Sequence, residues 1–428
     1  MEGIENLGSK LNTEENNKNE QFKNWQKNIT IFLTSQAISL FGSSLVQYAI
    51  IWYITLQTKS GVMTTIATIC GFLPQILISV FAGVWADRYN KKTLIAVSDT
   101  CIALSTLVVA IVFLAGFDYI WLLFIALGIR SLGGGVQTPA INSFIPELVP
   151  EDKLMKVNGI NTTIQSVMLI LSPAAGGALM GMLPIGRIFF IDVITALIGV
   201  GILLTIKLPK KEKQKDLEKP DYYKDIKEGL VYIKEHTFIK AFMKYYAILT
   251  VLISPIALLT PLLVARSFGE EVWRLTANEI VFFIGSIIGG ALVSVWGGFK
   301  NKIHTIAFAT FLTGVFSIAL GLAPSFMWYL VCMGILGIGM IFFNSPSVVI
   351  LQETVEQSIQ GRIFSIVQII GSGIMPLSML VYGPLSDRIK IEWIIIGASV
   401  LLMALGIAMV YDRNIKEYKV VEEIREEG

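Results

Sequence analysis

Long apolar stretches separated by short polar turns dominate this chain. A helix that crosses a bilayer needs about 20 mostly apolar residues, and twelve stretches have that length. They cover residues 29–56, 61–86, 93–115, 119–142, 155–182 and 185–207, then 237–264, 273–297, 302–323, 325–351, 361–384 and 391–411. The pattern predicts an all-α membrane protein built from two six-helix halves.

The polar segments divide the chain into expected domains. These are a disordered cytoplasmic tail (1–28), an N-terminal six-helix bundle (29–207), a cytoplasmic linker (208–236), a C-terminal six-helix bundle (237–411) and a second cytoplasmic tail (412–428). In the linker, Tyr223, Ile226, Leu230 and Ile233 recur every three or four residues, as on one face of a helix. We expect this helix to lie along the membrane face.

Composition agrees with a membrane protein. Hydrophobic residues make up 54% of the chain and charged residues 15%, against about 25% charged in soluble domains. Most of the 34 Lys and Arg residues fall on the side of the chain ends, so the positive-inside rule predicts a multi-pass protein of the plasma membrane with both termini cytoplasmic. Nothing in this distribution predicts nucleic acid binding.

The loop "GVWADRYNKK" interrupts two apolar stretches with a charged motif. Gly83 allows two helices to approach closely, and Asp87 can accept hydrogen bonds at the N-terminus of a neighbouring helix. The cations Arg88, Lys91 and Lys92 can bind lipid phosphates or a partner carboxylate. We call residues 83–92 the gate loop.

The gate loop resembles the signature loop of the major facilitator superfamily, and this resemblance extends over all twelve stretches. It implies that the loop closes the cytoplasmic gate, with Asp87 docking near Gly361 and Arg362; a positive loop that only sets topology is the alternative. The echo "VWGGFKNKI" has Gly298 in place of the aspartate. The look-alike "GPLSDR" falls on the external side, where we expect no role beyond capping.

Two further motifs resemble those of proton-coupled drug exporters. In "IRSLGGGVQTPA", Arg130 lies about 18 Å along a helix from Asp118, close to mid-bilayer, where a cation is costly. In "LSPAAGGAL", Pro173 removes a backbone hydrogen bond, and Gly176 and Gly177 permit close packing. The resemblance implies a coupling role for the arginine; the alternative is an arginine satisfied by packing partners.

Acidic residues also fall inside the stretches. Glu279 lies about 9 Å inward from Trp273. Asp192 lies inside its helix, a few residues from the external end. A buried carboxylate that changes partners can carry a proton, whereas a static pair at the external vestibule is the alternative. Asp99 is expected to pair with loop lysines near the cytoplasmic surface.

Strings such as "NEIVFFIG" and "GRIFSIV" resemble the macrolide-efflux branch of these exporters. This resemblance implies a proton antiporter that exports amphipathic drugs. The loops are too short for a catalytic domain, and the sequence has no glycine-rich phosphate loop and no histidine with a companion at metal-ligand spacing. We therefore expect no catalytic residues, no metal site and no cofactor beyond the proton gradient. A uniporter or importer of a small metabolite, or a non-transporting membrane receptor or scaffold, remains an alternative.

The expected substrate pocket lies between the halves. Its candidate residues, chosen by position along the stretches, are Gln36, Gln47, Tyr48, Gln165, Met168, Tyr246, Phe343 and Asn344. They mix polar groups with flexible and aromatic surface, which suits an amphipathic small molecule. Membrane lipid is the other expected partner, and one bundle of twelve helices suffices for transport.

Overall fold

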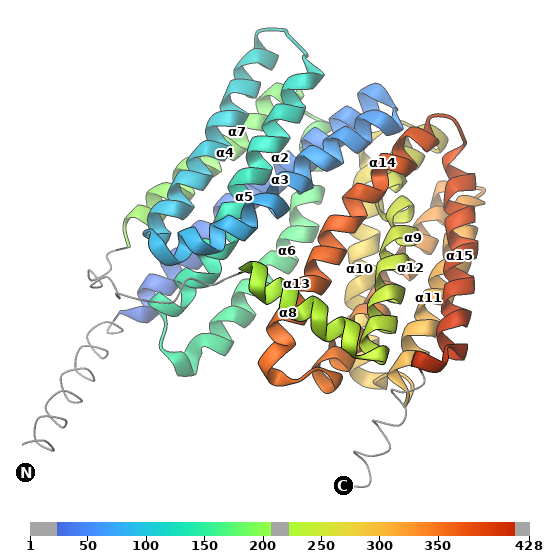
Figure 1. Ribbon diagram of the computed structural model, residues 1–428. Coiled ribbons are helices and arrows are strands. Elements are labelled where there is room, and N and C mark those ends of the chain that lie inside the picture. Colours follow the sequence, from blue (N-terminus) through green and yellow to red (C-terminus); the bar gives the residue numbers. More distant parts are fainter. Residues whose placement is uncertain (1–23, 207–221, 416–428) are drawn as a thin grey trace, which may run out of the picture. The chain divides into compact units, whose positions relative to one another are not determined.

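The computed structural model describes residues 24–206 and 222–415 (Figure 1). Within these residues, 12 helices are long and apolar enough to cross a membrane. The first six spans are α2 (Trp25–Thr58), α3 (Gly61–Arg88), α4 (Lys91–Leu114), α5 (Ile120–Leu148), α6 (Leu154–Met180), which follows the short helix η1 (Glu151–Lys153), and α7 (Ile185–Leu204).

The second six spans follow a short helix, α8 (Tyr222–Glu235). They are α9 (Thr237–Ser267), α10 (Val272–Trp296), α11 (Lys302–Gly321), α12 (Phe326–Thr354), a span in three parts, and α15 (Ile391–Tyr411). The three-part span consists of α13 (Gln357–Ile369), the π-helix η2 (Ile370–Ile374) and α14 (Met375–Ser386). The twelve predicted spans and the all-α fold are thus confirmed.

Local sequence sets several of the helix boundaries. The side chains of Asn90, Asn301 and Ser325 each accept a hydrogen bond from a backbone N–H in the first turn of α4, α11 and α12, respectively, as helix-capping residues do. α10 ends at Gly297, whose φ of 72° is left-handed. Because these caps are local, the expected and observed boundaries differ by only a few residues there.

The structure packs as two compact units, and their borders fall inside helices. Unit 1 comprises the described residues within Met1–Gln47, Leu77–Ser172 and Pro184–Pro220; unit 2 comprises those within Tyr48–Ile76, Pro173–Leu183 and Asp221–Gly428. The later parts of α2 and α6 and the first part of α3 therefore belong to unit 2.

Unit 1 is organised around α4, which packs against both α5 and α7 (Figure 1). Its apolar core includes Phe32 and Phe144, whose rings meet edge to face with centroids 5.1 Å apart. Phe113 and Phe189 form a second edge-to-face pair, between α4 and α7. These contacts fix the rotation of the helices, and so determine which polar residues face inward.

Unit 2 is organised around α9, which packs against α10, α14 and α15. One apolar core joins Trp52 of α2 to residues of α9, α12 and α15, including Leu259 and Tyr329, and each of these three side chains is almost fully buried. The pairs α11 with α15 and α10 with α12 lie side by side along their lengths. The final turns of α2 are thus held by helices of the second half of the sequence.

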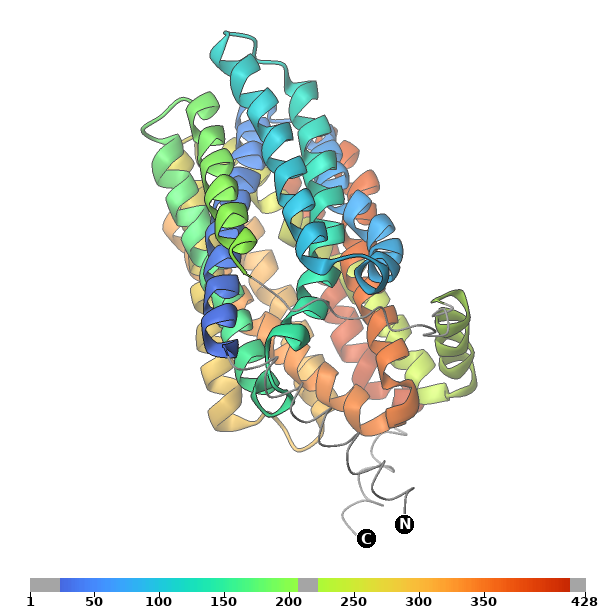
Figure 2. The same cartoon turned by 90° about the vertical axis from the view of Figure 1, so that its left-hand side faces the viewer.

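Helix α8 is attached to the bundle beside α13 and the start of α9 (Figure 2). Gly229 lies so close to α13 that an added Cβ would be 2.7 Å from Ile366 Cδ1, and Glu228 pairs with Arg362 at 3.0 Å. Of the predicted apolar stripe, Ile233 is buried and Leu230 remains exposed, while the side chain of Tyr223 lies outside the described part. The amphipathic helix therefore exists and docks on the protein by one edge.

Candidate functional site

A buried ion pair joins α5 to α7 inside unit 1. Arg130 Nη1 donates to Asp192 Oδ2 and, at 2.6 Å, to Thr106 Oγ1, and its Nη2 donates to the carbonyl of Ser43 at 2.7 Å. Asp192 also accepts hydrogen bonds from Ser43 Oγ at 2.9 Å and Thr106 Oγ1 at 2.7 Å. Arg130 is 6% exposed and Asp192 0%. Four helices therefore supply hydrogen-bond partners to one buried charge pair, as a pair in low dielectric requires. Among the described residues, Arg130 Nε is the one polar atom of the pair that has no partner.

A second polar layer lies two turns away in the same unit. Asp99 of α4 is buried, and its Oδ1 accepts hydrogen bonds at 2.8 Å from Ser39 Oγ and Gln137 Nε2. Among the described residues no partner reaches Asp99 Oδ2. The expected pairing of Asp99 with loop lysines is wrong, because the rotation of α4 directs this side chain into unit 1.

The residues of the two layers share a regular spacing that is visible in the sequence. Asp99 precedes Thr106 by seven residues and Gln137 follows Arg130 by seven, which is two helical turns or about 10 Å. Ser39 precedes Ser43 by four residues, one turn. Each of the helices α2, α4 and α5 thus contributes one residue to each layer. We call this set of residues, together with Asp192, the polar column.

Glu279 lies in unit 2, on α10, and is partly exposed. Its nearest polar contact is a long one of 3.4 Å, from Nδ2 of the neighbouring Asn278. Asn278 is buried and accepts a hydrogen bond of 2.5 Å from Tyr329 OH. Among the described residues Glu279 forms no ion pair, so the static pair considered from the sequence is not found there.

The eight residues chosen for a substrate pocket fall into both units. In unit 2 the structure brings two of them together: the rings of Tyr246 and Phe343 stack with centroids 5.6 Å apart. Gly371 of the π-helix lies against them, since a Cβ there would be 3.3 Å from Tyr246 OH. Of the other six, unit 2 contains Tyr48, which lies beside Trp52, and the partly exposed Asn344. Unit 1 contains the buried Gln36, the partly buried Gln47 and Met168, and the exposed Gln165.

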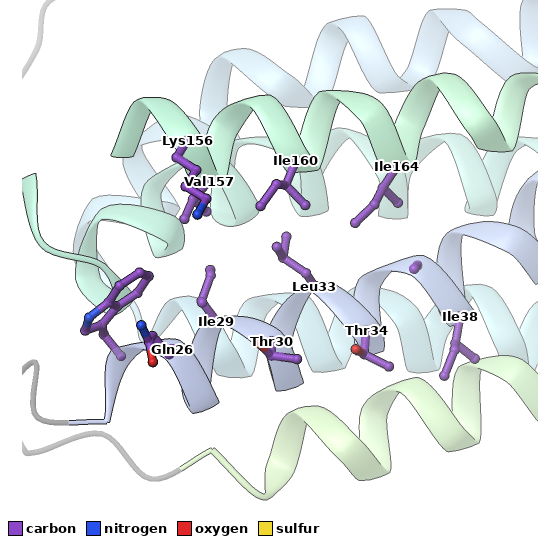
Figure 3. A pocket seen from close by; sticks show the side chains of 12 residues that line it. Gln26, Ile29, Thr30, Leu33, Thr34, Ile38, Lys156, Val157, Ile160 and Ile164 are labelled. Carbon is purple, nitrogen blue, oxygen red and sulfur yellow. The ribbon is translucent and has the colours of Figure 1, made fainter. Parts of the chain in front are cut away.

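Unit 1 also has a pocket of about 580 Å³ between α2 and α6 (Figure 3). Ile29 and Leu33 of α2 face Ile160 and Ile164 of α6 across it, and Lys156 lies at one end. None of the eight residues chosen from the sequence lines it. Sequence position could not reveal this pocket, because it depends on the spacing between two helices that are far apart in the chain.

Comparison with known proteins identifies the family. The model of the Major Facilitator Superfamily matches residues 32–378, most of the chain. This chain belongs to the major facilitator superfamily. The apolar spans, the gate loop and the polar column described above are therefore features of a membrane transporter.

Individual relatives and solved structures are similar to this chain over most of its length. Macrolide efflux protein A of Streptococcus pyogenes is 29% identical over 386 residues, which is 90% of this chain and 95% of that protein. The protein of the same name from Enterococcus faecalis is 29% identical over 73% of this chain and 97% of its own. A crystal structure of the peptide transporter POT has a TM-score of 0.71 at 11% identity, covering 92% of this chain and 95% of that one.

In this transporter, the gate loop is tied down within unit 1. Lys91 Nζ donates to Glu147 Oε1 at 2.9 Å, and Lys92 Nζ donates at 2.8 Å to the carbonyls of Leu204 and Ile206 at the end of α7. One cation thus has the partner carboxylate predicted for this loop, and another satisfies free carbonyls at a helix C-terminus.

The remaining gate-loop residues are less constrained. Gly83 is partly buried near the end of α3, and Arg88 is exposed, while the side chain of Asp87 lies outside the described part. Its docking near Gly361 and Arg362 stays a prediction. In the second-half echo, Gly298 has a left-handed φ of 86°, which favours glycine over the aspartate of the first copy.

The glycine pair of α6 makes a close helix contact within unit 2. Gly176 and Gly177 are buried, and a Cβ on Gly177 would lie 1.7 Å from Thr276 Oγ1 of α10. Pro173 lies inside α6, one turn earlier. The predicted close packing of this motif against a helix of the other half of the sequence is therefore present.

Proposed function

We propose that this transporter exports amphipathic drugs of the macrolide class in exchange for protons, by alternating access. The names of the relatives from Streptococcus pyogenes and Enterococcus faecalis support the substrate class and the direction. The concentration of Lys and Arg on the side of the chain ends supports cytoplasmic termini. A single chain contains both six-helix halves and suffices for the transport cycle.

The polar column is the observation that carries proton coupling. Its Arg130–Asp192 pair is held by neutral hydroxyls and carbonyls, so a proton that binds Asp192 removes the charge that faces Arg130. Arg130 keeps its charge at any physiological pH and must then find another partner. Asp99, with one carboxylate oxygen unpartnered among the described residues, offers a second proton-binding position in the same column.

Three features support an amphipathic substrate. The pocket between α2 and α6 is mainly apolar and has the size of small-molecule sites. The stacked Tyr246 and Phe343 provide a flat aromatic surface, and Glu279 provides a carboxylate to attract a basic amine. We propose that substrate contacts these groups in the course of transport.

The proposal is tested by accumulation of a labelled macrolide in drug-sensitive bacteria that express the chain, with and without a proton ionophore. We expect lower accumulation than in cells without the transporter, and reversal of that difference by the ionophore. Unchanged accumulation with the protein present in the membrane contradicts macrolide export. Accumulation above the control, insensitive to the ionophore, instead indicates an importer or uniporter.

Variants of the polar column test the coupling mechanism in the same assay. Asp192→Asn and Asp99→Asn keep the side-chain size but cannot carry a proton, so both should lose ionophore-sensitive efflux. Asp118→Asn, an exposed acid outside the column, is the matched control and should transport normally. Normal efflux in both column variants would assign the proton to other residues.

A further inference from the structure

Asp387 caps a helix that begins more than 300 residues earlier in the chain. Its carboxylate accepts hydrogen bonds from the backbone N–H of Gly61 at 2.6 Å and of Val62 at 3.0 Å, and from Ser60 Oγ at 2.8 Å. Gly61 is the first residue of α3, and Asp387 follows the last residue of α14. The N-terminus of a helix carries free N–H groups and partial positive charge, so an aspartate there is bound by direct donors and by the helix dipole.

Arg266 of α9 ties the same junction together. Its Nη2 donates to Asp387 Oδ1 at 2.6 Å and to the carbonyl of Lys59 at 2.5 Å, and its Nη1 donates to the carbonyl of Ser386 at 2.6 Å. Lys59 has a left-handed φ of 47°, which side chains of its kind rarely adopt, and its ammonium pairs with Glu270. The turn between α2 and α3 is therefore shaped by groups from α9 and α14.

Directly beside this cluster, α3 and α14 touch through their backbones. A Cβ on Gly61 would lie 2.2 Å from the carbonyl oxygen of Gly383, and Thr65 Oγ1 donates to the carbonyl of Met379 at 3.0 Å. Close backbone contact of this kind requires glycine. All of these residues lie in unit 2. The polar cluster and the glycine contact thus form one continuous seam.

This seam joins helices of the two six-span halves, which the alternating access proposed above moves apart. α3 belongs to the first six spans, and α9 and α14 belong to the second six. The side chains of Arg266 and Asp387 are each 27% exposed, so water can replace their mutual contacts when the helices part. "GPLSDR" also repeats the Gly-x-x-x-Asp-Arg spacing of the gate loop. It contacts the start of α3, whereas the gate loop includes the end of the same helix.

We propose that Lys59, Ser60, Gly61, Arg266 and Asp387 form a releasable latch on the external side, which sets how often the transporter opens outward. We call it the α3–α14 latch. Asp387 is a positioning residue, because it acts on the N-terminus of α3 and touches no substrate in this role. The proposal rests on the proposed function for its external orientation and for alternating access, but not for the substrate or the coupled ion.

The test measures how often the latch opens. Thr68 lies seven residues after Gly61, on the same face of α3, and is buried. The three native cysteines are first replaced (Cys70→Ala, Cys101→Ala, Cys332→Ala), and Thr68→Cys is then labelled from outside intact cells with a membrane-impermeant maleimide. Because a buried thiol reacts only when the seam opens, the labelling rate reports the open population.

Two variants remove the latch by different routes. Asp387→Asn removes the charge at the helix N-terminus, and Arg266→Gln removes the guanidinium that bridges Lys59 and Asp387. Each should raise the labelling rate about tenfold or more, the factor that corresponds to one charge-assisted hydrogen bond. Asp387→Glu keeps the carboxylate and should restore part of the protection, which a general loss of packing would not allow.

Arg388→Gln is the matched control, because it removes an exposed charge next to Asp387 and should leave the rate unchanged. Equal rates in the parent, Asp387→Asn and Arg266→Gln would show a static helix cap and overturn the proposal, as would an equal rise in Arg388→Gln. If Asp387→Asn fails to fold, Ser60→Ala removes one donor and should give a smaller rise. Labelling needs neither macrolide nor a proton gradient, so its result is separate from that of the efflux assay.

Discussion

The buried charged residues of the polar column differ in how well they tolerate losing a partner. In the polar column, Arg130 and Asp192 have several neutral partners each, but only one another as opposite charges among the described residues. An aspartate that loses its cation can take up a proton and become neutral, whereas arginine cannot lose one. Removing Asp192 and removing Arg130 should therefore lower the stability of the protein by different amounts.

We predict that Asp192→Ala destabilises the protein by about 3 kcal/mol or more, because it leaves the Arg130 charge buried without a counter-charge. Arg130→Ala should cost less. The measurement is thermal unfolding of the purified protein in detergent, alongside membrane expression.

Replacing both charged residues of the pair with apolar ones distinguishes a role in stability from a role in proton coupling. Arg130→Met combined with Asp192→Leu should recover most of the stability lost in Asp192→Ala, since apolar residues of similar size can replace a buried pair. The same double variant should not restore ionophore-sensitive efflux. Recovered efflux would remove the pair from the proposed coupling mechanism.

At the scale of the elements, two of the spans contain irregular features where they contact other helices. The span from α13 to α14 is interrupted by the π-helix η2, which lies beside Tyr246. π-helical turns are frequent at functional sites and create local bends. α6 has Pro173 followed by the buried glycine pair that contacts α10. We expect bending of these two spans to occur at these places.

The contact of Gly177 with Thr276 can be tested by adding and removing single groups. Gly177→Ala places a methyl group where Thr276 Oγ1 lies and should destabilise the protein by about 1–3 kcal/mol through overpacking. Thr276→Ala removes that oxygen, whose own hydrogen bond is within α10, and should be nearly neutral alone.

The double variant with both alanines should recover part of the stability lost in Gly177→Ala, because it removes Oγ1 at 1.7 Å but keeps the Cβ of residue 276 at 2.9 Å from the new methyl group. Gly201→Ala is the control, since a Cβ there meets nothing within 4 Å. All variants are compared by thermal unfolding. If the effects of Gly177→Ala and Thr276→Ala simply add in the double variant, the contact does not limit the packing of α6 on α10.

At the scale of the whole molecule, the compact units do not coincide with the two six-helix halves of the sequence. Unit 2 takes up residues 48–76 and 173–183 of the first half. The segment 48–76 contains the start of α3, and the α3–α14 latch is one of the contacts that hold it. The pH dependence of the latch depends on the ionisation of Asp387, with Arg266, Lys59 and Glu270 as the charged groups nearby.

Burial alone would raise the pKa of Asp387, but hydrogen bonds from Gly61, Val62, Ser60 and Arg266 outweigh it and lower the pKa below its usual value. A lowered pKa means that the latch is fully stabilised above the ordinary aspartate pKa of about 3.9 and weakens only as pH falls through the lower, folded-state pKa. The labelling rate of Thr68→Cys, corrected for the reactivity of the maleimide, should therefore be constant from about pH 8 to about pH 5. A rise in labelling between these values would mean that a different group controls the seam.

The sequence by itself determined the number of spans, their approximate ends and the family. These follow from the length of apolar stretches, from capping residues such as Asn90 and Asn301, and from strings such as the gate loop, all of which are local. The close packing of Gly177 was also predictable, because a glycine pair after a proline has a packing consequence in any helical bundle.

Only the tertiary structure decided which charged residues meet. Asp192 pairs with Arg130 from another helix, Asp99 faces Ser39 and Gln137 instead of loop lysines, and Asp387 caps α3 from across the sequence. Spacing along a chain gives the face of one helix, but not its rotation against a neighbour or the distance between two helices. Partners of this kind depend on side-chain packing over hundreds of residues, which explains why the strongest contacts of the molecule were absent from the sequence-based predictions.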